Sequence, residues 1–276
     1  MIIKISDCSS VIIRFAAKFE FMKSLKEIYQ EHTGRLLNKW EHYFDVYEQY
    51  FSKYRDKKIT LLEFGIAHGG SLELWRKYFG EAALIIGVDV NPECKKFEMP
   101  NTPVFIGSQE DKNFLSKLKS QVPEIDILID DGGHTMNQIN TSFLELFDHV
   151  KEDGIYAVED LHTCYWIDYG GGYKRKGTFN EFSKNIIDSL NAWHSRQSFF
   201  KPDNYTKSVH SIHFYDSVTV IEKRQMHPPV SLSSGVLIGD PFAEWKRGPV
   251  EKVVRKLGRT LNTILAWLRL PSIPKI

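Results

Sequence analysis

The segment IDILIDDGGH, residues 125–134, joins a short apolar run to a cluster of acids, two glycines and a histidine. A second apolar run, Ile155–Val158, ends in the acidic pair Glu159-Asp160. Asp131 and Glu159 are 28 residues apart, which is the length of one helix followed by one strand. We therefore expect the two acidic clusters at the ends of successive strands, close together at one edge of a sheet.

Three further apolar runs precede these two along the chain. They are Ile59–Phe64, Leu84–Val90 and Val104–Gly107, and a helix-like stretch follows each of them. Five short apolar runs that alternate with helices predict a parallel sheet covered on both faces. Ligands of such sheets gather outside the carboxyl ends of the strands, where the acidic and glycine-rich clusters of this chain are expected.

Two more predicted strands, Val209–Tyr215 and Val218–Lys223, alternate in polarity and are separated by Asp216-Ser217, which is a hairpin signal. A parallel α/β sheet that ends in an antiparallel hairpin is not the usual dinucleotide-binding topology, and it suits a class I methyltransferase. We expect a seven-stranded sheet with an antiparallel last strand. The predicted segments are a helical N-terminal segment (residues 1–58, helical from about 11 to 57), the sheet domain (59–224) and a C-terminal extension (225–276).

The charge of the chain is unevenly distributed. The formal net charge of +1 argues against a general nucleic-acid binder, but residues 246–276 hold eight Lys or Arg against one acid. Residues 250–270 predict a basic amphipathic helix, interrupted by Gly258. Such a helix fits two uses: docking on protein, on the chain's own domain or on a second copy in a homo-oligomer, or peripheral contact with an anionic membrane.

Cysteine usage and hydropathy bear on the compartment. The three cysteines are odd in number and lack metal-type spacing, as expected in a reducing compartment. Charged residues interrupt every apolar run near the N-terminus, and no stretch approaches the roughly 20 apolar residues that span a bilayer. The expected location is the cytoplasm, and the membrane alternative for the tail would place it on the inner membrane face.

The loop after the first run reads EFGIAHGGS, residues 63–71. Its small residues let the backbone approach a ligand, and the start of the following helix favours negative charge. The spacing does not match the dinucleotide fingerprint, whereas an acid two residues before the first glycine resembles the methyltransferase pattern. In that pattern the carboxylate positions the amino-acid part of S-adenosylmethionine; the alternative is an ordinary glycine-rich turn. The expected cofactor contacts in this loop are Glu63, Gly65, Ala67, Gly69 and Ser71.

Two further positions predict contacts with the same cofactor. Asp89 ends the second run 20 residues after Gly69, where an acid can accept both ribose hydroxyls; otherwise it is a turn residue before Asn91-Pro92. Ser108 and Gln109 follow the third run and resemble the adenine-contacting segment of catechol-type O-methyltransferases. Ser108 is also a candidate helix N-cap, with an acid three residues later.

The acidic clusters predict a metal site with a base beside it. Carboxylates buried together are costly unless a cation compensates them, and ligation by oxygen alone selects Mg²⁺, Ca²⁺ or Mn²⁺. His134 lies one turn beyond Asp131, and a neutral imidazole there can accept a proton. The alternatives are that Asp130 or Asp131 caps the next helix, that His134 is structural, and that Glu159-Asp160 is a solvated loop.

Four motifs carry a resemblance to a known family. They are KWEHYF (39–44), LEFG (62–65), IDDGGH (129–134) and VEDLHT (158–163). They resemble the metal-dependent sugar O-methyltransferases that tailor macrolide glycosides, a pattern shared with cephalosporin hydroxylase-like proteins and distantly with catechol O-methyltransferases. The resemblance covers about residues 38–223, and it departs at Gly133, where the family usually has serine.

The resemblance implies Asp131, Glu159 and Asp160 as ligands of Mg²⁺ or Mn²⁺, with His134 as the general base. Asp130 remains as a neighbour on the cofactor side. The aromatic stripe from Trp40 to Tyr47, with Tyr43 in it, would cover the cofactor, although an aromatic helix core explains the stripe equally well. The Tyr165–Tyr173 loop, with its three glycines, would close over the acceptor.

The expected activity is methyl transfer from S-adenosylmethionine to a hydroxyl of a sugar or glycoside, helped by Mg²⁺. The first alternative is a catechol- or phenol-type O-methyltransferase with a flat aromatic acceptor. A hydroxylase would need oxygen and a redox partner, which no residue indicates. A non-catalytic binding protein would require loss of the acids or of His134, and all are present.

Overall fold

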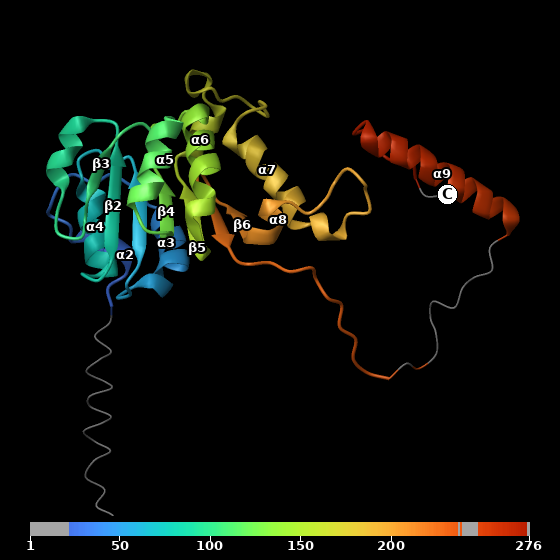
Figure 1. The fold of residues 1–276 in the computed structure, drawn as a ribbon, viewed down its shortest axis with the longest axis horizontal. Coiled ribbons are helices and arrows are strands. Elements are labelled where there is room, and N and C mark those ends of the chain that lie inside the picture. The colour runs from blue at the N-terminus through green and yellow to red at the C-terminus, as the bar shows by residue number, and fades with distance from the viewer. Residues whose placement is uncertain (1–21, 237, 239–247, 275–276) are drawn as a thin grey trace, which may run out of the picture. The chain divides into compact units, whose positions relative to one another are not determined.

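The computed structural model describes residues 22–236, 238 and 248–274 (Figure 1). The chain divides into two compact units, one up to Pro229 and one from Val230 onward. The first unit contains the sheet and all the candidate site residues. The described residues of the second contain a single helix.

Seven strands form one sheet in the order β3-β2-β1-β4-β5-β7-β6. Strand β7 runs antiparallel to its neighbours β5 and β6, and the other neighbouring strands pair in parallel, which confirms the predicted class I methyltransferase sheet. The strands are β1 (Thr60–Phe64), β2 (Leu84–Asp89), β3 (Val104–Ile106), β4 (Ile125–Asp130), β5 (Val150–Val158), β6 (Val209–Phe214) and β7 (Thr219–Lys223).

Helices cover both faces of this sheet, which explains why its central strands are continuous apolar runs (Figure 1). On one face Leu61 and Ile127 pack with α2 (Leu25–Gln30), α3 (Tyr43–Phe51) and α4 (Gly70–Phe79). On the other, Leu62 and Leu128 pack with α5 (Lys112–Gln121), α6 (Met136–Leu146) and α7 (Phe179–Leu190). Between residues 22 and 229 the remaining helices are α8 (Asn204–Ser208) and the short 3-10 turns η1 (Ser52–Tyr54), η2 (Pro92–Phe97), η3 (Phe147–His149), η4 (Leu161–Tyr165), η5 (Ile167–Tyr169) and η6 (Ala192–His194).

The predicted long N-terminal helix is wrong in its middle part. The described residues are helical at α2, α3 and η1, whereas residues 31–42, here called the strap, are not helical. The strap crosses the start of α4 so closely that a Cβ on Gly70 would lie 2.4 Å from the carbonyl oxygens of Arg35 and Leu36. This tertiary contact outweighs the local helical pattern. The prediction for residues 11–21 lies outside the described residues.

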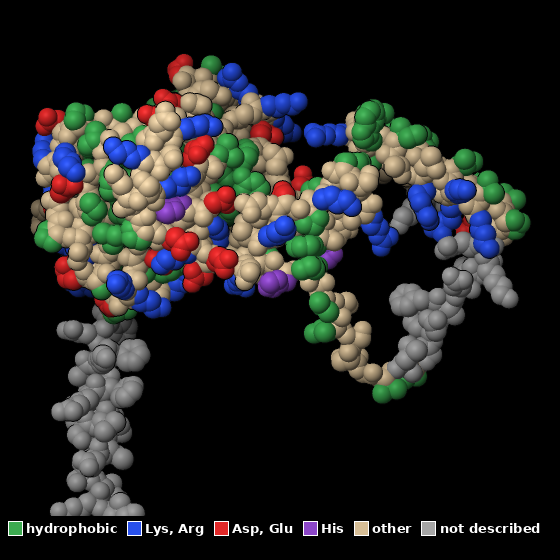
Figure 2. Space-filling view, in the orientation of Figure 1, with side chains coloured by type: hydrophobic (Ala, Val, Ile, Leu, Met, Phe, Trp, Pro, Cys, Tyr) green, Lys and Arg blue, Asp and Glu red, His purple; other side chains and the backbone are tan. Residues whose placement is uncertain are grey.

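The second unit contains α9 (Pro249–Trp267). The helix continues through Gly258, so the predicted interruption is wrong. Leu257 and Ile264 are exposed, as are Lys252, Lys256 and Arg259, and none of its residues is buried. Figure 2 shows apolar and basic side chains along this helix. Across the described part of the chain, no helix combines the length and the hydropathy needed to cross a membrane.

Candidate functional site

A cavity of about 420 Å³, here called the edge cavity, opens at the carboxyl ends of β1 to β4. Gly65 has φ +80°, and a Cβ there would lie 1.9 Å from the carbonyl oxygen of Asp131, so the turn admits only glycine. Five predicted cofactor residues line this cavity: Gly65, Ala67, Asp89, Ser108 and Gln109. Five others do not line it: Glu63, Gly69, Ser71, Asp130 and Tyr43.

The glycine-rich loop holds the Asp89 carboxylate in place at the rim of the edge cavity. Asp89 Oδ2 accepts a hydrogen bond from the Ala67 amide (3.0 Å), and Oδ1 accepts one from the Asn91 amide (2.9 Å). Ala67 reaches this geometry with φ +44°, an uncommon conformation for a residue with a Cβ. The carboxylate is therefore oriented before any ligand binds.

Two capping alternatives are wrong. Helix α5 is capped by Asp111, whose side chain accepts from the amides of Asn113 and Phe114, so Ser108 does not cap it. Helix α6 is capped by Thr135, whose side chain accepts from the Gln138 amide. The acids of the IDDGGH motif are thus free of capping roles.

Asp130 is a buried support for the cavity wall. It is 1% exposed, and its carboxylate accepts from Gln109 Nε2 (2.8 Å) and from Ser142 Oγ. Burial raises the pKa of Asp130, an effect that these hydrogen bonds oppose. Gln109 in turn accepts from the Gly133 amide (2.9 Å), and a Cβ on Gly132 would lie 1.7 Å from Gln109 Oε1. Asp130 therefore acts on the edge cavity through Gln109.

Asp131, His134 and Asp160 converge beside this cavity, each with a potential ligand atom within 4.8 Å of the others. His134 Nε2 lies 3.8 Å from Asp131 Oδ1 and 3.6 Å from Asp160 Oδ2. His134 (φ +55°) and Asp160 (φ +52°) both adopt left-handed backbone conformations. Such strain is concentrated at functional sites, where the surrounding structure maintains it.

Glu159 is 1% exposed, and both of its oxygens have partners inside the protein. Oε1 accepts from the Tyr47 hydroxyl (2.6 Å), and Oε2 accepts from Lys39 Nζ (2.8 Å). Lys39 also donates to Asp131 Oδ2 (2.6 Å) and lies 3.6 Å from Glu63 Oε1, while its side chain is only 2% exposed. A single buried ammonium thus joins three carboxylates.

Sequence reasoning gave Lys39 and Tyr47 no individual role. The available signal was electrostatic: buried acids require a compensating charge, and Lys39 begins the KWEHYF motif. Tyr43, expected over the cofactor, instead donates to Asp160 Oδ1 (2.8 Å). The strap and α3 therefore supply partners for every acid of the proposed metal set.

The electrostatics of this cluster favour binding of a further cation. Burial raises the pKa values of Asp131 and Glu159 to about 7, although the Lys39 ammonium opposes the shift. Burial disfavours the charged ammonium, but Asp131 and Glu159 raise the Lys39 pKa well above its usual value. Three acids thus share one buried lysine, while Asp160 lies beside His134, and oxygen donors are what a hard divalent ion prefers.

Two buried atoms in the site have no hydrogen-bond partner in the described structure. They are Nδ1 of His134 and Oε1 of Glu63, whose other oxygen accepts from Ser71 Oγ (2.6 Å). Buried polar groups are normally satisfied, so each atom is available to a ligand. A cationic or hydrogen-bonding molecule fits the site on this ground.

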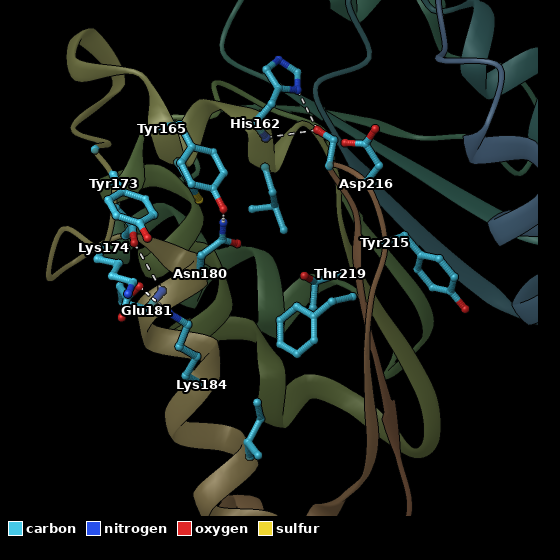
Figure 3. A pocket seen from close by; sticks show the side chains of 17 residues that line it. His162, Tyr165, Tyr173, Lys174, Asn180, Glu181, Lys184, Tyr215, Asp216 and Thr219 are labelled. Carbon is cyan, nitrogen blue, oxygen red and sulfur yellow. Dashed lines mark hydrogen bonds and ion pairs between the residues drawn. The ribbon is translucent and has the colours of Figure 1, made fainter. Parts of the chain in front are cut away.

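A second cavity, of about 720 Å³ and here called the side cavity, lies between η4, α7 and the turn that joins β6 to β7 (Figure 3). Leu161 and His162, the two residues that follow Asp160, form part of its wall. Ser217 accepts from the amides of both, through its carbonyl (2.9 Å) and its Oγ (3.1 Å), and so fixes this boundary.

No family model matches the chain. It is 34% identical over 191 residues to an 8-demethyl-8-alpha-L-rhamnosyl tetracenomycin-C 2'-O-methyltransferase of Streptomyces olivaceus, covering 66% of this chain and 50% of that protein. It is 34% identical over 215 residues to a demethylmacrocin O-methyltransferase of Streptomyces fradiae, covering 72% and 54%. The chain therefore spans about half the length of these relatives.

Among solved structures, the fold is similar to that of the MycE methyltransferase from the mycinamycin biosynthetic pathway, in complex with Mg and SAH. The TM-score is 0.67 at 27% identity, covering 74% of this chain and 55% of that one.

Proposed function

Because this chain belongs to the family of metal-dependent sugar O-methyltransferases, we propose that it transfers a methyl group from S-adenosylmethionine to a hydroxyl of a sugar in a glycoside or glycan. The observation that carries the proposal is the position of His134. Its imidazole lies between Asp131 and Asp160 and also lines the edge cavity.

The edge cavity is the proposed site of the methyl donor. Asp89, held by the Ala67 amide, would accept the ribose hydroxyls, and Ser108 and Gln109 would contact the adenine. Oε1 of Glu63, which accepts no hydrogen bond and lies 3.6 Å from Lys39 Nζ, would accept from the donor's amino group. The Gly69 amide donates to the Ile66 carbonyl within the loop, Ser71 donates to Glu63, and Asp130 supports Gln109.

Asp131, Glu159 and Asp160 are the proposed ligands of Mg²⁺, for which Mn²⁺ is a chemically similar probe. The bound ion would supply Lewis-acid stabilisation of negative charge on the acceptor oxygen. These carboxylates are held in place by hydrogen bonds from Lys39, Tyr47 and Tyr43, each of which donates to one or two of them. Such supporting hydrogen bonds orient metal ligands.

His134 is the proposed general base. It would take the proton of the acceptor hydroxyl while the oxygen forms its bond to the methyl carbon and the sulfur–methyl bond breaks. The products are the methyl ether, S-adenosylhomocysteine (SAH) and a protonated imidazole. Asp131 and Asp160, within 3.8 Å of Nε2, would stabilise that imidazolium. A sugar hydroxyl is a weak acid, so a base and a metal together make chemical sense.

Deuteromethyl-labelled S-adenosylmethionine tests the proposal. The full chain is incubated with Mg²⁺ and either a panel of glycosides or a panel of catechols, and products are read by mass spectrometry. Label appearing in glycosides and disappearing with excess chelator supports the proposal. Label appearing only in catechols would favour the phenol-type alternative, and activity that persists in chelator would refute the role of the metal.

Helix α9 belongs to a wider proposal on location and assembly. We propose a cytoplasmic protein in which the exposed apolar stripe of α9 makes an intermolecular contact. Besides docking on the chain's own domain, two predicted uses are intermolecular: docking on a second copy in a homo-oligomer and contact with the inner membrane face, and both suit its basic and apolar faces. Molecular mass in solution and sedimentation with liposomes distinguish these uses.

A further inference from the structure

No residue proposed above to hold the donor or the metal lines the side cavity. Of the described residues, none that lines it also lines the edge cavity. The two cavities flank the segment that carries Asp160, and Thr163 Oγ1 donates to the His134 carbonyl (3.0 Å) across that segment. Both cavities open at the carboxyl edge, because the β6–β7 turn lies beside the end of β5, where Val158 pairs with Thr219.

Exposed aromatic rings and polar groups alternate on the walls of the side cavity. Tyr165 is 57% exposed and Tyr173 80%, and they lie on the side of the η4–η5 loop and α7 (Figure 3). The Asn180 amide reaches the Tyr165 hydroxyl (3.4 Å), and Glu181 pairs with Lys184 below it. Phe214 adds a ring from the opposite side.

A row of neighbouring rings, Trp40, His162 and Trp166, connects the strap with this cavity. Trp40 follows Lys39, which contacts Asp131, and its ring centroid lies 6.0 Å from that of His162. The His162 ring lies 4.8 Å from that of Trp166 and lines the side cavity. Trp40 (55%) and Trp166 (49%) remain exposed, so both rings beside His162 are accessible to a ligand.

We infer that the side cavity is a saccharide subsite, which binds further sugar residues of an oligosaccharide acceptor whose methylated ring lies at the metal. A sugar ring has an apolar C–H face, which packs on aromatic rings, and a rim of hydroxyls, which the amide of Asn180 and the charged groups of Glu181 and Lys184 can bind. The inference rests on the proposed function and extends it to the acceptor's class.

Size and polarity both support a saccharide occupant. The volume of about 720 Å³ falls within the range of roughly 300–1,000 Å³ that holds drug-sized ligands, and it exceeds the need of one sugar ring. A polyketide aglycone presents fewer hydroxyls per unit of surface than an oligosaccharide, so it offers fewer hydrogen-bonding partners to Asn180, Glu181 and Lys184. The mixed wall therefore favours a hydroxyl-rich chain.

A glycan array tests the inference with the full chain, labelled and loaded with SAH and Mn²⁺. Arrays carry single sugars and oligosaccharides side by side, and a set of glycosylated macrolides is added. We expect the strongest retention on oligosaccharides. Asn180→Ala and Tyr173→Ala should lower retention on those spots about fivefold, the loss expected for one hydrogen bond or ring contact, and leave single-sugar spots unchanged.

Asn185→Ala is the matched control, because Asn185 is exposed on the same helix and does not line the cavity. Binding confined to single sugars or macrolides, no binding to any glycan, or equal effects of Asn180→Ala and Asn185→Ala would overturn the inference. Methyl transfer to single-sugar glycosides tests the proposed function separately. If that transfer occurs and oligosaccharides gain nothing, only the subsite is wrong; if oligosaccharides are retained without any transfer, only the proposed function is wrong.

Discussion

Lys39 Nζ lies 2.6 Å from Asp131 Oδ2, and the two residues are 92 positions apart in the sequence. The ion pair ties the strap to the end of β4 and extends to Glu159 at 2.8 Å. Because the lysine side chain is almost fully buried, its charge is weakly screened by solvent. The two carboxylates depend on that charge to offset the cost of their own burial.

Replacing Lys39 with methionine should destabilise the metal-free protein strongly. Removing one partner of a buried ion pair leaves an uncompensated charge and typically costs about 3–5 kcal/mol. We expect a loss of this order in urea unfolding near neutral pH, and a smaller loss in acid, where the carboxyls are protonated. Lys26→Met is the control, since Lys26 pairs with Glu41 at the surface. Loss of this pair should leave the free energy of unfolding nearly unchanged. Equal effects of the two variants would contradict the assignment.

The pKa values of about 7 for Asp131 and Glu159 predict pH-dependent metal binding. In the unfolded chain these carboxyls titrate near pH 4, so the folded metal-free protein holds the protons more tightly. Their contribution to stability is therefore present below about pH 4 and is lost as pH rises toward about 7. Added Mn²⁺ should raise the melting temperature more at about pH 8 than at about pH 6. A metal effect that is equal at the two values would disprove proton competition.

His134→Ala should lower kcat by about 10²–10⁴, the usual contribution of a general base. SAH and Mn²⁺ binding should persist, because the carboxylates and the edge cavity remain. Asp131→Ala should abolish turnover and also weaken Mn²⁺ binding, and calorimetry separates the two variants. His42→Ala serves as a control, since that exposed ring contacts only the Asp216 carbonyl (3.0 Å) and the neighbouring rings of Trp40 and Tyr43. A His134 variant with near-normal kcat would remove it from the mechanism.

Gly65→Ala should abolish SAH binding, because its Cβ would lie 1.9 Å from the Asp131 carbonyl. Gly177→Ala isolates the backbone contribution: Gly177 has φ +92° and no atom within 4 Å of its Cβ position. That variant should cost about 1–3 kcal/mol of stability, the usual strain, and keep SAH binding. If both variants bind SAH equally well, the close approach at Gly65 has no bearing on the donor site.

Deleting residues 246–276 should abolish sedimentation with anionic liposomes if α9 binds membranes. Binding should also fall with rising salt, since Lys252 and Arg255 on α9 would contribute electrostatically. Neutral liposomes provide the control. Equal sedimentation of the full and shortened chains would exclude the membrane use, and a change of solution mass on deletion would support the oligomer instead.

The sheet, and the meeting of Asp131, His134 and Asp160 at its edge, were predictable because local chemistry determines them. A strand that is buried on both faces is a continuous apolar run in the sequence, so these strands could be recognised. The spacing from Asp131 to Glu159 places the two acids at the ends of neighbouring strands. The strap was not predictable, since its aromatic and charged residues fit a helix locally and only contact with Gly70 disfavours one. The pairing of Lys39 was missed for a related reason: the sequence around a buried acid does not show which lysine will form an ion pair with it.

Lys39 lies before β1, upstream of every residue proposed to bind the metal. A fragment trimmed to the sheet would keep all the proposed ligands and lose their buried counter-charge. The same separation orders the folding of the chain, because contacts between distant segments form late and are entropically costly. Asp131 and Glu159 have their buried counter-charge only after β5 has been placed and the strap has packed against both acids. The strap, which precedes the sheet in the sequence, would therefore be the last of these parts to dock.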